Sequence, residues 1–412
     1  MFRTYDIRGV YGKDVNLQNF FVLGGALAAF SRKIVAGMDY RRNNNLLLEA
    51  LFEGFDGEKT FMGVAPTPAV AFASNELGVS LTASHNPPEY NGLKPLKQKR
   101  SFYSEELADL KKEFEDRAER AKEFKARNNP IETVDSLLEG YRDSLPDFGN
   151  AVFDLAGGAV CSLKSVFPKV LFSEPDPMFV RHSAEPTADA IGTLVSESKK
   201  DNALGFAFDG DGDRCVCVDS GKIVDSGAAA AFFAVNFLQK GSRIVLTLDF
   251  QEEVFVFLED NGFKPSYSPV GDIFVLKKAE ELGADFSAEK SGHYSVFKHI
   301  PYSDGVYFSA LLSQSKAGEL VEFSKQFKSV FVSESIHNVT VDFRKLAELV
   351  NGLNPARVET IDGVKASFED YTFLIRPSNT QPLVRVSVEA NNREGGIEGL
   401  RIAKELVLDC KA

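Results

Sequence analysis

Residues 204–214, with the sequence LGFAFDGDGDR, place three carboxylates directly after an apolar run. Like charges this close repel one another unless a positive charge lies among them, and the intervening glycines let the backbone bend so that all three face one centre. The carboxylates belong to Asp209, Asp211 and Asp213. Hard oxygen ligands favour Mg²⁺ over softer metals. We therefore predict a divalent cation site, with an ordinary Asp-Gly turn as the alternative.

A calcium-binding EF-hand is a second candidate for this acidic stretch, and its spacing can be counted from Asp209. The sixth position of such a loop is glycine and the twelfth is a bidentate glutamate. In this chain those positions hold Arg214 and Ser220. The EF-hand is therefore excluded. An arginine beside three aspartates instead indicates a site where an anion, such as a phosphoryl group, joins the metal.

The pattern on both sides of this stretch is that of an α/β protein. Apolar runs typical of strands, such as residues 243–248, alternate with helical patterns, such as residues 20–35, and this predicts mixed or mostly parallel sheets. A chain of 412 residues is too long for one ordinary core, so we expect three or four domains of roughly 100 residues each. Residues 128–130, with the sequence NNP, interrupt a helical pattern and mark a first boundary.

Composition and net charge limit the class of partner. The chain is 44% hydrophobic and 26% charged, and its formal net charge of -12 argues against nucleic acid or an anionic membrane as the main partner. No apolar run reaches membrane-spanning length, and the first residues do not have the pattern of a signal peptide. Four scattered cysteines are too few for a disulfide framework. We therefore expect a reduced, cytoplasmic protein.

A second polar loop, residues 82–94, follows a strand-like run that ends at Leu81. Its Ser84 lies between a strand and a proline-rich turn, so we expect this serine to be exposed on a rigid loop. In the alternative interpretation Ser84 is a turn residue, and His85 and Asn86 cap its backbone. The chain has no Gly-x-Ser-x-Gly elbow, so ordinary esterase chemistry has little support.

The third polar loop holds Glu289, Ser291 and His293 at alternate positions. An extended backbone would present these three side chains on one side. A carboxylate with a hydroxyl next to it suits the vicinal hydroxyls of a sugar. The loop is therefore a candidate sugar-binding site, with a solvated turn as the alternative.

The fourth polar loop runs from Arg376 to Arg385 and is rich in groups that bind anions. An arginine, a serine, an asparagine and a threonine occur within five residues, with backbone amides between them, and such a cradle suits phosphate. These residues are Arg376, Ser378, Asn379 and Thr380. In the alternative interpretation Asn379 and Thr380 form a hairpin turn, and Arg385 is a surface charge on the strand that follows.

Together the four loops resemble the motifs of one family, the α-D-phosphohexomutases, which include phosphomannomutases and phosphoglucomutases. The serine, aspartate, sugar and phosphate loops occur in that family's order, and residues 2–9, with the sequence FRTYDIRG, are similar to its opening segment. The resemblance covers most of the chain. It implies four domains around a central cleft: three similar α/β domains with mixed sheets, and a smaller C-terminal α+β domain.

The resemblance also implies that each domain contributes one loop. We expect the phosphoserine loop in residues 1–129, the metal-binding loop in residues 130–226, the sugar-binding loop in residues 227–330 and the phosphate-binding loop in residues 331–412. The expected partners are small sugar phosphates, with neither nucleic acid nor a membrane, and the expected quaternary state is a monomer or a homodimer.

The chemistry of the family implies a role for each loop. Ser84 carries a phosphoryl group, and Asp209, Asp211, Asp213 and a phosphoserine oxygen hold Mg²⁺. The phosphoryl group passes to a hexose 1-phosphate of mannose, of glucose or of both, and gives a hexose 1,6-bisphosphate that is also the expected activator. This intermediate turns within the cleft and returns its 1-phosphate to Ser84, so that hexose 6-phosphate leaves.

Supporting roles follow from the same resemblance. Lys94 and His293 are the candidates for general acid and base, and the sequence does not rank them. Arg214 is a candidate for stabilising the phosphoryl group during transfer. The remaining assignments place Arg8 and His85 beside the phosphoserine, Glu289 and Ser291 on the sugar hydroxyls, and Arg376, Ser378, Asn379, Thr380 and Arg385 on the phosphate.

The chain departs from the family's pattern at three positions. Ala288 replaces a glycine of the sugar loop, Gln381 replaces a glutamate of the phosphate loop, and Ile273 stands where a basic residue is usual. If that basic side chain helps to hold the substrate, its loss weakens the assignment of specificity. The close alternative is a phosphoglucosamine mutase, which shares the fold and the chemistry but acts on an amino sugar. A sugar-phosphate-binding homologue without turnover and a Mg²⁺-dependent phosphatase are the more distant ones.

Overall fold

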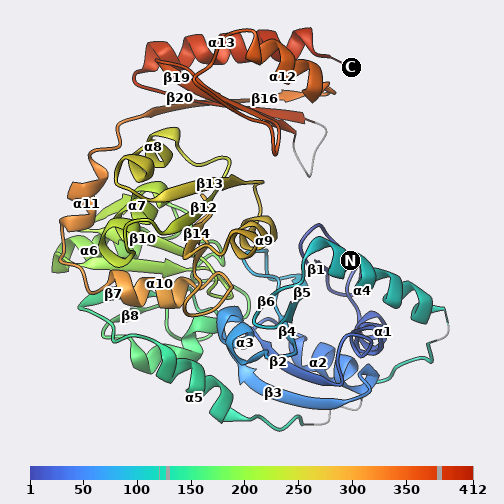
Figure 1. The fold of residues 1–412 in the computed structure, drawn as a ribbon. Coiled ribbons are helices and arrows are strands. Elements are labelled where there is room, and N and C mark those ends of the chain that lie inside the picture. Colours follow the sequence, from blue (N-terminus) through green and yellow to red (C-terminus); the bar gives the residue numbers. More distant parts are fainter. Residues whose placement is uncertain (120, 127–129, 378–382, 412) are drawn as a thin grey trace.

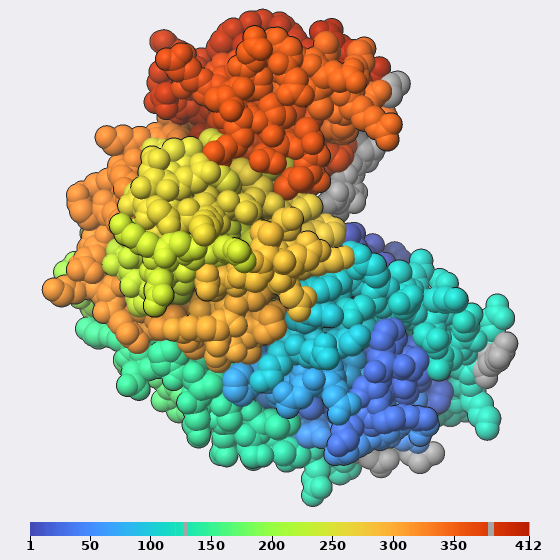
Figure 2. Space-filling view, viewed as in Figure 1, coloured from blue at the N-terminus to red at the C-terminus, as the bar shows by residue number. Residues whose placement is uncertain are grey.

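The computed structural model describes residues 1–119, 121–126, 130–377 and 383–411 of the 412-residue chain. Within these residues the chain forms four successive units, each built on its own β-sheet (Figure 1). The space-filling view is indented between the first unit, in blue and cyan, and the last unit, in red (Figure 2). The four-domain α/β architecture expected from the sequence is confirmed.

The first unit packs helices against a six-stranded mixed sheet. The strand order is β1-β5-β4-β2-β3, with β6 paired to β5, and β2 is parallel to both of its neighbours. The strands are β1 (Ile7–Val10), β2 (Lys33–Met38), β3 (Glu58–Val64), β4 (Leu77–Leu81), β5 (Tyr90–Lys97) and β6 (Arg100–Ser101). The helices are α1 (Leu17–Leu27), α2 (Asn44–Gly54), α3 (Thr67–Ala73) and α4 (Ser104–Ala118). The serine loop connects β4 to β5.

The helix expected over residues 20–35 is shorter than predicted. Helix α1 begins after Asn16, whose side chain accepts a hydrogen bond from the amide of Asn19, and it ends at Leu27. Residues 28–32 are neither helix nor strand, and the last three residues of the expected helix belong to strand β2, where Ile34 is buried between two parallel neighbours. Apolar residues continue through both elements, so the pattern did not reveal the break, and the pairing with β3 and β4 decides for the strand.

The second and third units place their functional loops at antiparallel strand pairs. Helix α5 (Asp135–Ser144) precedes a five-stranded sheet of order β11-β10-β9-β7-β8, and the third sheet has the order β13-β12-β14-β15. The strands are β7 (Ala151–Asp154), β8 (Val170–Leu171), β9 (Leu204–Phe208), β10 (Cys215–Asp219), β11 (Lys222–Val224), β12 (Arg243–Thr247), β13 (Lys264–Ser268), β14 (Phe286–Ala288) and β15 (Tyr294–Val296). The helices are the 3₁₀ helix η1 (Ala159–Val166), α6 (Gly192–Asp201), α7 (Ser226–Phe237), α8 (Glu252–Asp260), α9 (Asp272–Leu282), α10 (Gly305–Leu312) and α11 (Glu319–Ser324). The aspartate loop joins β9 to β10, and the sugar loop joins β14 to β15.

The fourth unit is an antiparallel sheet of order β16-β20-β19-β18-β17 with two helices on one face (Figure 1). Its strands are β16 (Val330–His337), β17 (Arg357–Glu359), β18 (Val364–Ser367), β19 (Tyr371–Pro377) and β20 (Leu383–Ala390), and its helices are α12 (Phe343–Asn351) and α13 (Arg393–Asp409). The smaller C-terminal α+β domain expected from the sequence is therefore present.

The hydrophobic cores divide the molecule unequally. Met62 of the first unit, Phe153 of the second and Phe233 of the third belong to one continuous buried cluster. The fourth unit has a core of its own, which includes Phe373 and Val407. The second and third units therefore share a core that extends into part of the first unit, and the first unit also has a separate cluster of its own, which includes Phe20 and Leu51. Among the described residues, no helix is long and apolar enough to cross a membrane.

Candidate active site

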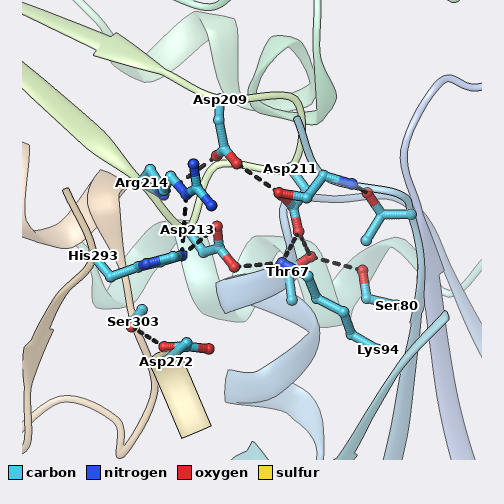
Figure 3. Close-up of polar contacts among 12 residues, drawn as sticks. Thr67, Ser80, Lys94, Asp209, Asp211, Asp213, Arg214, Asp272, His293 and Ser303 are labelled. Atoms are coloured by element: carbon cyan, nitrogen blue, oxygen red, sulfur yellow. Dashed lines mark hydrogen bonds and ion pairs between the residues drawn. The ribbon is translucent and has the colours of Figure 1, made fainter. Parts of the chain in front are cut away.

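The three aspartates lie buried in the loop between β9 and β10 (Figure 3). One carboxylate oxygen from each of Asp209, Asp211 and Asp213 lies within 4.8 Å of the other two. The loop folds back on itself, because Asp209 Oδ1 accepts hydrogen bonds from the amides of Gly212 (3.0 Å) and Arg214 (3.3 Å). Gly212 has a φ of 76°, which favours glycine. The glycine-spaced motif thus brings the carboxylates to one centre.

The charge of this cluster fits a divalent cation. Asp211 Oδ1 and Asp213 Oδ1 are buried without a hydrogen-bond partner among the described residues. Burial, reinforced by the charges of Asp211 and Asp213, raises the pKa of Asp209 to about 8. A cation would compensate this buried negative charge, and the carboxylate oxygens are hard donors that could bind it. The cluster is therefore a set of residues that could hold a metal ion.

Lys94 of β5 brings positive charge to the cluster from the first unit. Its Nζ lies 2.6 Å from Asp211 Oδ2 and 2.5 Å from Asp213 Oδ2. Burial opposes the charged form of this side chain, but the two aspartates outweigh burial and hold the pKa of Lys94 well above its usual value. Lys94 is therefore cationic in this arrangement and joins the first unit to the second.

Ser84 reaches the same cluster from the serine loop. Its Oγ donates a hydrogen bond of 2.8 Å to Asp209 Oδ2. The expectation that Ser84 is exposed is wrong, since it is only 2% exposed. The reason is the second unit, which covers the loop so closely that a Cβ on Gly210 would lie 2.6 Å from the carbonyl oxygen of Ser84. The hydroxyl is thus held at the edge of the candidate metal site.

His85 lies beside the Ser84 hydroxyl as a neutral side chain. Its Nδ1 is 3.2 Å from Ser84 Oγ. Burial, together with the positive charges of Arg214, Arg8 and Lys94, lowers the pKa of His85 to about 3. At neutral pH this histidine can therefore act on the serine through a hydrogen bond and not through charge.

Arg8 of β1 is anchored next to the serine loop. Its Nε donates to Asp6 Oδ2 at 2.7 Å, and its guanidinium also bonds to Asn86 Oδ1. Burial opposes its charge, but Asp6 outweighs burial and raises the pKa of Arg8. Arg8 therefore places a permanent positive charge against Asn86, which is two residues after Ser84 in the serine loop.

The three polar residues of the sugar loop meet one another through a turn. Glu289 N donates to the carbonyl oxygen of His293 at 2.9 Å, and Gly292 has a φ of 95°. The expected extended backbone is therefore wrong, because β14 ends at Ala288 and the chain reverses. The side chains nevertheless gather, since His293 Nδ1 lies 2.8 Å from Glu289 Oε2 and 3.0 Å from Ser291 Oγ.

His293 also links the sugar loop to the aspartate loop. Its Nε2 is 3.4 Å from Asp213 Oδ1 and 3.4 Å from Arg214 Nε. Burial opposes the charged imidazolium, but Asp213 and Asp272 outweigh burial and raise the pKa of His293 to about 10. Both candidates for proton transfer, Lys94 and His293, thus contact the aspartate loop (Figure 3).

The phosphate loop is described only at its two ends. Arg376 on β19 and Arg385 on β20 are directly opposite one another. Arg376 Nη1 lies 3.3 Å from Asp362 Oδ2, and its Nε is buried without a hydrogen-bond partner among the described residues. Arg385 is exposed. The other residues predicted for this loop, Ser378, Asn379 and Thr380, and the departure at Gln381, lie outside the described residues.

Sequence reasoning missed Thr67 and Asp272. Thr67 opens α3, its Oγ1 donates to Asp211 Oδ2 at 2.6 Å, and its amide donates to the carbonyl oxygen of Asp211 at 2.9 Å. The Thr-Pro pair at its position is a helix-start signal that could have pointed to free amides at this site. Asp272 offers an oxygen within 4.8 Å of ligand atoms of Glu289 and His293. It directly precedes Ile273, in a segment whose resemblance to the family implied no role for this carboxylate.

The other two departures from the family's pattern are accommodated. Ile273 is 2% exposed and belongs to the large hydrophobic core, so its side chain fills space in the protein interior. Ala288 is the last residue of β14 and does not have a positive φ. A side chain at position 288 therefore causes no backbone strain.

The sequence matches the four domain models of one family along most of its length. Domain I of phosphoglucomutase/phosphomannomutase matches residues 1–121, domain II residues 147–222, domain III residues 226–331 and the C-terminal domain residues 337–399. A phosphomannomutase of Methanocaldococcus jannaschii is 28% identical, with 99% of this chain and 97% of the relative covered. A phosphoglucosamine mutase of Thermotoga maritima is 28% identical over 95% of each chain. A phosphomannomutase/phosphoglucomutase of Pseudomonas aeruginosa is also 28% identical, with 96% and 92% covered.

Solved structures share the fold. A phosphoglucomutase/phosphomannomutase family protein from Burkholderia thailandensis superposes with a TM-score of 0.84 at 24% identity, and 98% of this chain and 96% of that one are covered. An N-acetylphosphoglucosamine mutase of Aspergillus fumigatus, solved with GlcNAc-6P and magnesium, has a TM-score of 0.58 at 15% identity, with 98% and 94% covered. The arrangement of four units in Figure 1 is thus shared with these proteins.

Proposed function

The chain belongs to the phosphoglucomutase/phosphomannomutase family, and on this basis we propose that it interconverts hexose 1-phosphate and hexose 6-phosphate of mannose, of glucose or of both. The observation that carries the proposal is the 2.8 Å hydrogen bond from Ser84 Oγ to Asp209 Oδ2. It places a hydroxyl that can carry a phosphoryl group beside carboxylates that could hold a metal ion. The enzyme is an isomerase, since substrate and product differ only in the position of the phosphate.

The first transfer moves the phosphoryl group from Ser84 to the sugar. The bond between phosphorus and Ser84 Oγ breaks while a bond forms between phosphorus and the free 6-hydroxyl oxygen of hexose 1-phosphate. The hydroxyl proton passes to a base, and Ser84 Oγ leaves with the electron pair and takes up a proton. The product is hexose 1,6-bisphosphate. After this intermediate turns, the same steps in reverse return its 1-phosphate to Ser84 and leave hexose 6-phosphate.

We propose Mg²⁺ as the metal, held by Asp209, Asp211, Asp213 and an oxygen of phosphorylated Ser84. Hard carboxylate oxygens suit this ion, and the Aspergillus fumigatus enzyme of similar fold was solved with magnesium. When bound, the ion supplies positive charge for the phosphoryl oxygens during transfer. Arg8 and Arg214 would add permanent positive charge around Ser84. The neutral His85 would orient the hydroxyl of Ser84.

Lys94 and His293 are the proposed groups for proton transfer. Both are cationic in the described arrangement because aspartates hold their pKa values high, so each can donate a proton to an oxygen that leaves. Aspartates that share their charge with a metal ion would hold these pKa values less strongly, which would allow either group to serve as the base. His293 also contacts Glu289 and Ser291, so it lies beside the proposed sugar ligands.

The second phosphate of the substrate would be bound by the fourth unit. We propose that Arg376 and Arg385 bind it together with Ser378, Asn379 and Thr380. Arg376 supports this role because its buried Nε is a donor without a partner among the described residues. One such site would accept either phosphate of the bisphosphate, so the sugar can turn without a second site. Glu289 and Ser291 would hold the sugar hydroxyls in both orientations.

A phosphoglucosamine mutase is the second candidate, because the Thermotoga maritima relative of that name is as similar as the phosphomannomutase. We also propose domain limits at residues 129, 226 and 330, where sequence patterns change. A cytoplasmic location and a monomeric or homodimeric state stay predictions.

The test supplies each sugar 1-phosphate in turn. Purified protein, Mg²⁺ and a catalytic amount of glucose 1,6-bisphosphate are incubated with mannose 1-phosphate, glucose 1-phosphate or glucosamine 1-phosphate, and the 6-phosphates are measured. Mannose or glucose 6-phosphate should form fastest. Faster conversion of the glucosamine ester would select the second candidate, release of inorganic phosphate would indicate a phosphatase, and conversion of none of the three would contradict the proposal.

A further inference from the structure

Arg41, three residues after the end of β2, lies buried beneath the serine loop. Its side chain is inaccessible to solvent, and its guanidinium donates to four main-chain carbonyl oxygens of the loop and of the start of β5. These acceptors are Ser84 O at 2.6 Å, Asn86 O at 2.6 Å, Pro87 O at 2.7 Å and Tyr90 O at 3.1 Å. One planar cation therefore fixes the backbone on both sides of the predicted phosphorylation site.

Asp39 extends this contact to the amide of Ser84. Its Oδ2 accepts from Arg41 Nε at 3.1 Å and from Thr82 Oγ1 at 2.7 Å. Thr82 Oγ1 in turn accepts from the amide of Ser84 at 2.8 Å. Both main-chain polar groups of Ser84 are thus tied to the buried Asp39–Arg41 ion pair, the carbonyl directly and the amide through one hydroxyl.

The backbone of Ser84 needs such support. Its φ of 51° lies in the left-handed region, which is unfavourable for a residue with a Cβ unless the surroundings impose it. This conformation accompanies the hydrogen bond from Ser84 Oγ to Asp209. A change of φ would swing the hydroxyl away from the aspartates.

Arg41 also contacts the second unit where that unit covers the loop. Its Cζ lies 5.1 Å from the centre of the Phe179 ring, a cation–π distance. The Ser84 carbonyl that Arg41 binds is the one packed against Gly210, next to Asp209. Arg41 therefore touches both sides of the junction that places Ser84 against the aspartate loop.

We propose that Arg41, with Asp39 as its counter-ion, is a positioning residue that holds Ser84 Oγ in place for phosphoryl transfer. The inference rests on the proposed function. In each cycle Ser84 alternates between a neutral hydroxyl and a phosphate ester of about two negative charges, next to three aspartates. The loop must keep the same geometry in both forms, so that the oxygen that gave up the phosphoryl group can accept the next one. A clamp on the backbone does so without contacting the substrate.

Arg41→Lys is the direct test, with Arg42→Lys as the matched control. Lysine retains the charge that partners Asp39, but its single ammonium cannot reproduce the planar set of bonds to four carbonyls. Arg42 is the adjacent residue and is exposed. We expect kcat per phosphorylatable enzyme to fall about 10²-fold in Arg41→Lys, as for a displacement of about 1 Å at a reacting group, with little change in KM. Arg42→Lys should match the wild type.

The readouts separate positioning from a loss of folded protein. The phosphorylatable fraction is measured by intact mass after incubation with glucose 1,6-bisphosphate, and the activity is divided by that fraction. Thr82→Val, which keeps the shape of the side chain but removes the link to the Ser84 amide, gives a second test if Arg41→Lys does not fold. It should lower kcat in the same way, by a smaller factor.

Two results would overturn the inference. A folded Arg41→Lys enzyme, or Thr82→Val if the former does not fold, with the kcat of the wild type would show that the clamp is not needed for transfer. A rise in KM at unchanged kcat would place the role in substrate binding. If the wild type itself converts none of the sugar phosphates, the proposed function fails and this inference fails with it. If the wild type is active and the variant has the same kcat, only the positioning role is contradicted.

Discussion

The junction of the serine and aspartate loops differs from the end of the fourth unit that is proposed to bind phosphate in how its charges are partnered. At the junction Lys94 of the first unit bonds to Asp211 and Asp213 of the second unit. These charged side chains therefore hold one another in place across the two units. In the fourth unit Arg376 has a carboxylate partner, Asp362, at 3.3 Å, and its Nε has no hydrogen-bond partner among the described residues. The junction is therefore organised before substrate arrives, whereas Arg376 has donor capacity left for a ligand.

The hydrophobic packing also sets the fourth unit apart from the other three. One large hydrophobic core runs through the second and third units and into part of the first, whereas the fourth unit has a separate core. Polar contacts help to join the fourth unit to the third: Glu389 accepts from the amide of Glu252 at 2.7 Å, and Lys365 Nζ donates to Tyr267 Oη at 2.6 Å. Polar interfaces between domains permit more relative motion than apolar ones do. The groups proposed for phosphoryl transfer therefore lie where the first and second units meet, and the proposed phosphate-binding residues lie on the unit with a separate core.

The largest effect that would test this contrast is expected at the junction. Asp213→Asn should reduce kcat by at least about 10³-fold, because it removes a proposed metal ligand and a carboxylate that contacts both Lys94 and His293. Asp109→Asn, on the exposed face of α4, is the control and should be neutral. Steady-state kinetics at saturating Mg²⁺ measures both. A decrease in kcat of less than tenfold in Asp213→Asn would contradict a role of the aspartates in phosphoryl transfer.

The next largest expected effect is the stabilisation by Mg²⁺ of the units that share the large hydrophobic core. Mg²⁺ at about 100 times its Kd should stabilise the units that share the large core by about 2.7 kcal/mol, because it binds the folded aspartate loop and not the unfolded chain. Differential scanning calorimetry with Mg²⁺ and with a chelator should show an upward shift of their transition and none of a transition from the fourth unit. A single transition that shifts as a whole would show that the fourth unit unfolds together with the others.

A smaller effect is expected at the phosphate-binding end. Arg376→Gln should raise KM about 30-fold with a lesser change in kcat, since a hydrogen bond to a charged group contributes about 2 kcal/mol to binding. Arg344→Gln, on the exposed side of α12, is the control. Initial rates over a range of sugar 1-phosphate separate the two parameters. A decrease in kcat alone would place Arg376 in the chemical step. It would contradict the separation of phosphoryl transfer at the junction from phosphate binding by the fourth unit.

The sequence predicted those parts of the site that depend on local chemistry. The glycine-spaced aspartates meet because the glycines permit the turn, and Asp209, Asp211 and Asp213 could be named without the structure. The burial of Ser84 could not be predicted, since it arises from a second unit far away in the sequence.

Other features were hidden for related reasons. Thr67 and Arg41 act through contacts that only the folded chain creates. The break between α1 and β2 lies inside an apolar stretch, where strand pairing outweighs the local helical pattern. Local motifs therefore gave the chemistry of the site, and long-range packing gave its geometry.

The most direct test of the account is the location of the phosphoryl group. Wild-type protein and the Ser84→Ala variant are incubated with Mg²⁺ and glucose 1,6-bisphosphate, and each is analysed by intact mass and by peptide mapping. The wild type should gain one phosphoryl group on the peptide that contains Ser84, and the variant should gain none. An unchanged adduct in Ser84→Ala, or a wild-type adduct on another residue, would contradict the assignment of Ser84 as the group that carries the phosphoryl.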